Sequence, residues 1–212
     1  MAEIRAEMLL TWMQLIDFYT LQRALDGLTD DEFAWKPHPG AWGVVRRAEC
    51  ATPSPSGAPD GEWVVDNDMD LVKAAFDQWR QGVPVNEATA FEPMTTIGWL
   101  LNHFGAAPGL AATLHFLGGP TEPTREVYGR MWAHTIIGTA DEAVARFRDG
   151  WAVLGAALTD ATDEMLEREY DEYPRKTGYA STSALLNEVA HHGTQICVLR
   201  DLYRQLGSRR AS

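Results

Sequence analysis

The chain has 212 residues, of which 45% are hydrophobic, and it carries a formal net charge of -12 at pH 7. This is enough apolar material for one well-filled core, so a single domain over residues 1–212 is expected. A protein of this negative charge is repelled by the phosphates of nucleic acid, and the sequence has no cluster of Lys and Arg between aromatic residues. Nucleic acid is therefore not expected as a partner.

The first helix is predicted from about Glu3 to Leu28, and the sequence LTDDE follows it as a turn. Apolar residues recur along it near helical spacing, which predicts one buried face. The residues assigned to that face are Ile4, Met8, Leu15, Phe18, Leu21 and Leu25.

A long loop insertion, about residues 43–93, is predicted between the first and second helices. It contains many prolines and turn-forming residues and has little sustained periodicity. A short hairpin around Val44 and Val64 and a brief helix at Met69–Arg80 are expected within it.

The second long helix is predicted from about Thr95 to Leu117, with a kink or an end at Pro108. No charged residue occurs from Pro93 through Thr121. Asn102, His103 and several glycines interrupt this stretch, so it predicts an amphipathic helix and no membrane partner.

A third helix is expected to begin at Thr139, which has capping-box spacing to Glu142, and to continue to about Ala161. The fourth is predicted to follow Ser181–Ser183 and to end at Leu206. Four long helices with no sustained strand pattern predict an all-α fold, a four-helix bundle.

The apolar stripe of the fourth helix includes Val189 and Ile196, and Glu188 and His192 fall within it. Four residues apart, this carboxylate and imidazole are stacked one helical turn above the other. His103 lies at the centre of the corresponding stripe of the second helix.

An ionised carboxylate in an apolar stripe is costly unless a charge compensates it, as a divalent cation bound by two neutral imidazoles does. The spacing supports an open metal site formed by His103, Glu188 and His192. It equally supports an intrahelical Glu188–His192 pair at the rim of the bundle, with His103 as a hydrogen-bonded core histidine.

Three segments of the chain have recognisable motifs: NEVAHHGTQICVLRDLYRQLG in the predicted fourth helix, TTIGWLLNH in the second, and FAWKPHPGAWGV after the first. They resemble, in that order, the last helix of the DinB-like superfamily, usually NHxxHHRGQI, its second-helix signature, and the segment after its first helix. Members are metal-binding bundles, commonly with three histidines, which implies His103 as the first ligand and His192 as the last. Glu188 stands where many members have the middle histidine, as in the branch with mycothiol-dependent maleylpyruvate isomerase and related thiol transferases.

The resemblance implies one divalent metal ion, with zinc first on ligand type and nickel or iron as alternatives. It also implies a low-molecular-weight thiol such as mycothiol, a small-molecule substrate and a homodimer. His191 and Gln195 are expected to support a ligand without binding the metal, or to be plain surface or boundary residues. Trp35 and Trp42 are expected either to plug a bundle end or to shape a substrate mouth.

The expected function is therefore a metal-dependent and thiol-dependent transferase or isomerase acting on small electrophilic molecules. A non-catalytic, metal-stabilised stress or ligand-binding bundle and a metal-dependent hydrolase are the alternatives. The two cysteines, Cys50 and Cys197, form no disulfide framework, and the N-terminus shows no signal peptide, so a cytoplasmic location is expected.

Overall fold

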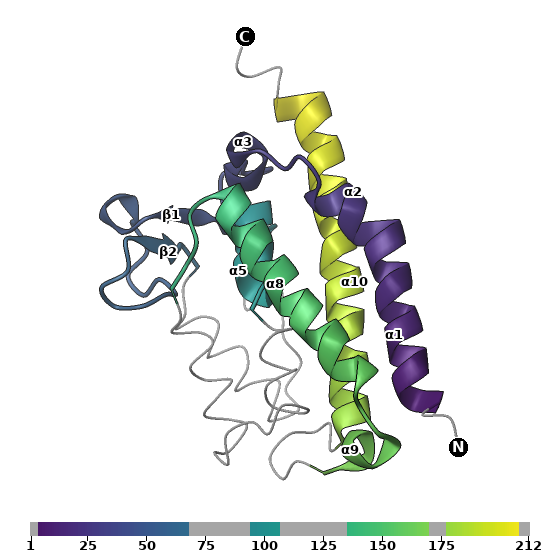
Figure 1. The fold of residues 1–212 in the computed structure, drawn as a ribbon. Coiled ribbons are helices and arrows are strands. Elements are labelled where there is room, and N and C mark those ends of the chain that lie inside the picture. Colours follow the sequence, from purple (N-terminus) through teal and green to yellow (C-terminus); the bar gives the residue numbers. More distant parts are fainter. Residues whose placement is uncertain (1–3, 68–93, 107–134, 170–176, 208–212) are drawn as a thin grey trace, which may run out of the picture.

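The structure is a computed structural model that describes residues 4–67, 94–106, 135–169 and 177–207 (Figure 1). The helix expected at Met69–Arg80 and the predicted second helix beyond residue 106 lie outside these ranges. The described residues are mostly helical and include one small two-stranded sheet. None of their helices is long and apolar enough to cross a membrane.

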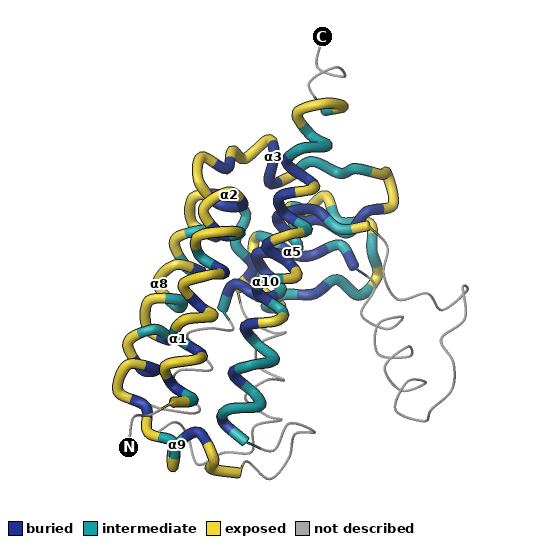
Figure 2. Tube along the Cα trace, turned by 90° about the vertical axis from the view of Figure 1, so that its right-hand side faces the viewer, coloured by how far each residue is buried: buried dark blue, intermediate teal, exposed yellow. Residues whose placement is uncertain are grey.

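Four helices surround the main core. Helices α1 (Ile4–Ile16), α8 (Ala140–Thr159) and α10 (Gly178–Leu202) lie side by side, with α8 antiparallel to the other two (Figure 1). The shorter α5 (Ile97–Phe104) packs against α8 and α10, as α1 does from its own side. Buried residues of these helices gather on the side of this shared interior (Figure 2). Helix α5 lies beside the middle of α10, where the rings of His103 and His192 meet.

The first helix extends through a π-helical turn, η1 (Asp17–Leu21), and a last α-helical turn, α2 (Gln22–Leu25), close to the predicted span. The predicted buried face is correct at Leu21 and Leu25 and wrong at the four residues before them. Ile4, Met8, Leu15 and Phe18 are exposed, and the core side is formed by Ala6, Leu9, Met13 and Ile16. Apolar residues occupy both sides of this helix, so periodicity alone does not choose between them.

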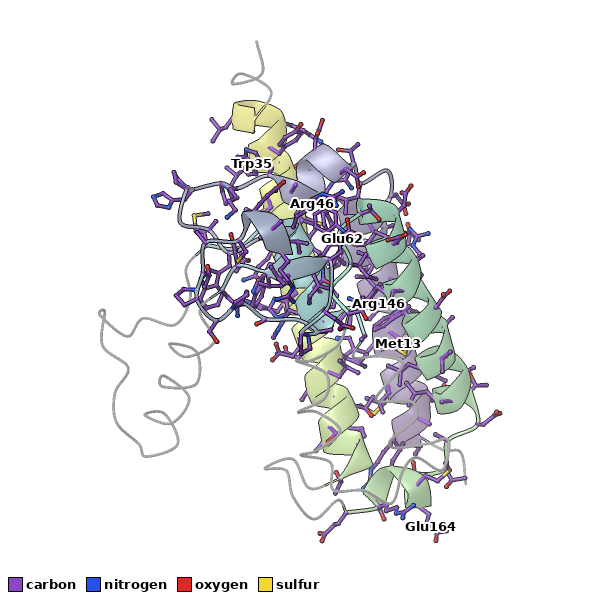
Figure 3. All side chains as sticks on the ribbon, turned by 90° about the vertical axis from the view of Figure 1, so that its left-hand side faces the viewer. Met13, Trp35, Arg46, Glu62, Arg146 and Glu164 are labelled. Carbon is purple, nitrogen blue, oxygen red and sulfur yellow. The ribbon has the colours of Figure 1, made fainter. Side chains whose placement is uncertain are left out.

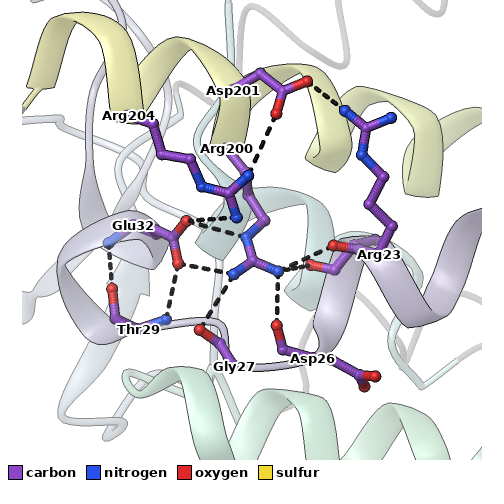
Figure 4. A network of polar contacts seen from close by, with 9 residues as sticks. Arg23, Asp26, Gly27, Thr29, Glu32, Arg200, Asp201 and Arg204 are labelled. Atoms are coloured by element: carbon purple, nitrogen blue, oxygen red, sulfur yellow. Dashed lines mark hydrogen bonds and ion pairs between the residues drawn. The ribbon is translucent and has the colours of Figure 1, made fainter.

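A buried arginine connects the C-terminal part of α10 to the segment that follows the first helix (Figure 4). The guanidinium of Arg200, on α10, pairs with Glu32 at 3.0 Å and donates to backbone carbonyls that follow α2, including those of Asp26 and Gly27. Glu32 also completes a capping box with Thr29 at the start of α3 (Asp30–Ala34). The end of α2 turns at Gly27, whose φ of 62° is in the left-handed region that favours glycine.

The hairpin predicted around Val44 and Val64 is confirmed. Strand β1 (Val44–Arg46) pairs antiparallel with β2 (Trp63–Val65), and a short 3-10 helix, η2 (Arg47–Glu49), follows β1. Just before β1, the backbone of Trp42 bonds to Met94 and Thr96, the latter at 2.8 Å. These bonds tie the start of the insertion to the N-terminus of α5.

The third and fourth long helices begin differently from the prediction. Thr139 makes no side-chain cap; instead Asp30 accepts from the Ala140 N–H at 2.7 Å and caps α8 from a distant part of the chain. Helix α10 begins earlier than predicted, because Thr177 caps it by accepting from Ala180 N–H at 3.1 Å. A short helix, α9 (Asp163–Glu167), lies between α8 and α10.

Candidate metal centre

Helix α10 carries His192 into the interior where α10 packs against the π-helical turn η1. A Cβ atom on the next residue, Gly193, would lie only 2.7 Å from Thr20 in the π-helical turn, so glycine permits this contact. His192 is buried, between Val189 and Ile196, which are both fully buried. The apolar surroundings leave few directions in which its imidazole can find polar partners.

Glu188 lies one turn before His192, and its Oε2 is 3.4 Å from His192 Nε2. The expectation that both side chains lie inside the apolar stripe is only half correct. The side chain of Glu188 is 45% exposed, against 11% for His192. Glu188 therefore stands at the rim of the site, where water offsets part of the cost of its charge.

Gln195 fixes the orientation of His192. Its Oε1 is 2.7 Å from His192 Nδ1. An amide oxygen only accepts hydrogen bonds, so Nδ1 carries the proton in this contact. The other nitrogen, Nε2, is consequently the one that faces Glu188, and in a neutral ring it carries the lone pair that a metal ligand requires.

His103 approaches from α5. Its ring stacks on Trp99, with centroids 4.6 Å apart, and lies edge-on to the ring of His192, with centroids 5.2 Å apart. Burial, with a smaller contribution from the neighbouring His192, lowers the pKa of His103 to about 4. His103 is therefore a neutral imidazole at physiological pH, the form that binds metals.

Phe104 closes the apolar side of the site. Its ring stacks on His192 with a centroid separation of 5.5 Å and meets Phe147 of α8 edge-on at 5.3 Å. Two aromatic side chains from α5, Trp99 and Phe104, thus hold the two imidazoles in place. This packing positions the rings without using their nitrogen atoms.

A family model described as the DinB superfamily matches residues 18–196, which include the three predicted ligands. The chain belongs to the DinB superfamily. No curated protein and no solved structure matches it.

The donors of this DinB-superfamily chain suit a divalent ion in kind, since two imidazoles and one carboxylate are common zinc ligands. The structure brings Glu188 and His192 together and sets the His103 ring beside them. Within the described ranges, however, no three or more His, Cys, Asp or Glu side chains are grouped so as to hold a metal ion. The three residues therefore match a divalent metal in ligand type, while their described positions do not form a three-ligand group.

The other histidines of the described chain, His38 and His191, have exposed side chains. His191 is exposed, with its ring 5.1 Å from that of His192, and His38 is exposed and accepts a bond from Gly40 N–H in a turn. His115 and His134 lie outside the described residues. Cys197 is a buried free thiol next to the backbone of Thr20, and burial raises its pKa.

The two tryptophans before the insertion, Trp35 and Trp42, lie in different surroundings. Trp42 lies 6.0 Å from Trp99, centroid to centroid, and so belongs to the aromatic cluster next to His103. Trp35 instead contacts Tyr203 at the far end of α10, 5.8 Å away. The mouth-forming role therefore fits Trp42, and the plugging role fits Trp35.

A polar network beside His103 was not predicted from the sequence. The buried side chain of Asn102 exchanges two hydrogen bonds with the backbone of Ile137 and accepts another from Arg146 at 3.1 Å. Arg146 projects from α8 towards α5 (Figure 3). The one available signal was a lone amide in the otherwise apolar sequence IGWLLNHF.

Proposed function

We propose that this chain is a four-helix bundle that holds one divalent metal ion through His103, Glu188 and His192. The contact between His192 and Glu188 carries the proposal. Because His192 Nδ1 donates to Gln195, a neutral ring turns a lone pair on Nε2 towards a carboxylate oxygen 3.4 Å away. Two electron-rich atoms are stable in this position only with a proton or a cation between them.

The ring of His103 favours a metal cation, in place of a proton, between His192 Nε2 and Glu188. A protonated His192 would carry its charge 5.2 Å, ring to ring, from a neutral imidazole in apolar surroundings. A metal ion at the same place would instead gain a second nitrogen ligand. Zinc suits two imidazoles and a carboxylate, and the same set suits iron or nickel.

The reaction we propose is transfer or isomerisation with a low-molecular-weight thiol, such as mycothiol, acting on small electrophilic molecules. A metal ion with an open coordination position lowers the pKa of a bound thiol and so supplies a thiolate nucleophile. Trp99 and Phe104 exclude water from the inner side of the site. The half-exposed side of Glu188 is where thiol and substrate would enter.

A second candidate function is a non-catalytic bundle that binds a small ligand or is stabilised by its metal. The contact between Glu188 and His192 favours it, because an intrahelical pair of this spacing can stabilise a helix without doing chemistry. Hydrolysis by an activated water would use the same three residues and differs only in the nucleophile.

The test is formation of a thioether by zinc-loaded protein with mycothiol, cysteine or coenzyme A and an activated aryl halide. The thiol sulfur forms a bond to the ring carbon, halide leaves, and the thiol proton goes to the buffer. We expect a rate at least about tenfold above the uncatalysed reaction. His103→Ala should abolish the increase and His191→Gln should retain it. Stoichiometric zinc without acceleration by any thiol would select the non-catalytic candidate.

A further inference from the structure

Among the described residues, no carboxylate pairs with the charge of Arg146. Its Nη1 donates to the Thr135 carbonyl and its Nη2 to Asn102 Oδ1, each at 3.1 Å, and both acceptors are neutral. Its buried Nε has no hydrogen-bond partner, and none of the ion pairs among the described residues includes Arg146. On the same helix, by contrast, the exposed Arg148 pairs with Asp26.

The position of Arg146 connects it to the two imidazoles. Asn102, which orients its guanidinium, precedes His103 in α5. Phe147, the next residue of α8, packs on Phe104, which stacks on His192. The guanidinium therefore lies beside the same turn of α5 that carries His103.

An unpaired, half-buried guanidinium is a favourable place for an anion. Burial lowers the pKa of Arg146, which reflects the cost of holding its charge away from water. Its two bonds use one N–H of Nη1 and one of Nη2, so each of these nitrogens keeps a second N–H for a ligand, while Nε is buried. Two neighbouring N–H groups of a guanidinium match the two oxygens of a carboxylate, which they bind through paired hydrogen bonds.

We propose that Arg146 binds the carboxylate of a small anionic ligand, with Asn102 and the Thr135 carbonyl fixing the plane of the guanidinium. Anion binding requires neither a metal nor a thiol. The further step, that the bound anion is the electrophilic substrate, rests on the proposed function. Thr135 is exposed, so the ligand has access from the Nη1 side.

Calorimetric titration of metal-free protein with malonate, at constant ionic strength set with chloride, tests this site apart from any activity. Wild-type protein should bind malonate, Arg146→Gln should bind at least about tenfold more weakly, and Arg148→Gln should bind as wild type does. Arg146→Lys keeps the charge and should fall between them. No binding by wild type, equal binding by Arg146→Gln, or binding of phosphate in preference to malonate would overturn the proposal.

Discussion

The Oε1 atom of Gln195 lies 2.7 Å from Nδ1 of His192, one turn further along α10. This contact decides which nitrogen of the buried imidazole remains for another partner, and that nitrogen faces Glu188. A single amide thus connects the packing of the helix core to the chemistry of the proposed site.

Gln195→Ala is expected to weaken metal binding by about 10- to 100-fold, because the ring of His192 loses the acceptor that holds it. Gln195→Glu keeps an acceptor oxygen at this position and should restore most of the affinity. Competition with a chromophoric chelator measures both variants. His191→Gln is the matched control on the same helix, and an equal loss of affinity there would show that Gln195 has no specific role.

Lowering the pH should destabilise the metal-free protein through His103. Its pKa is about 4 in the folded chain, against an ordinary value of 6.5. Between these values the unfolded chain binds a proton at His103 and the folded chain does not, so stability falls as the pH is lowered. The full shift corresponds to about 3 kcal/mol of unfolding free energy. This stability is present well above pH 6.5 and is lost progressively as the pH falls from about 6.5 to about 4.

Urea unfolding of wild type and His103→Phe at pH 7, 5 and 4 measures this contribution. The variant should lose less stability than wild type on going from pH 7 to 4, and the difference should be largest at pH 4. Parallel losses in the two proteins would mean that His103 titrates normally in the folded state.

Arg200→Met should cost about 3–5 kcal/mol of stability, since Glu32 would remain buried without its principal counter-charge. Burial acts to raise the pKa of Glu32, but its bonds to Arg200 and Thr29 lower it overall. Arg204→Gln, at a side chain that is 56% exposed and 3.9 Å from Glu32, is the control and should cost less than about 1 kcal/mol. Chemical denaturation measures both; a small loss in Arg200→Met would mean that the pair contributes little.

The sequence predicted elements whose signals are local. The span of the first helix, the helix after Thr139 and the hairpin at Val44 and Val64 follow from periodicity and turn residues within a few positions. The pairing of Glu188 with His192 also follows from their spacing on one helix. Helical projection placed His103 at the centre of the second helix's apolar stripe, and the family resemblance implied it as the first ligand.

Features that depend on distant segments could not be predicted in this way. The cap that Asp30 provides for α8 and the bonds of Arg200 to the end of α2 join residues more than 100 positions apart. The buried side of α1 was assigned wrongly because both of its faces are apolar. Arg146 carried no local signal, because its environment is formed by α5 and the segment at Thr135.

The most direct test of the metal centre is elemental analysis of protein purified without a histidine tag, for wild type, His103→Ala and His191→Ala. The proposed site predicts about one divalent ion per chain in wild type and in His191→Ala, with zinc first, and a large loss in His103→Ala. Equal metal in wild type and His103→Ala, or substoichiometric metal in all three proteins, would contradict it.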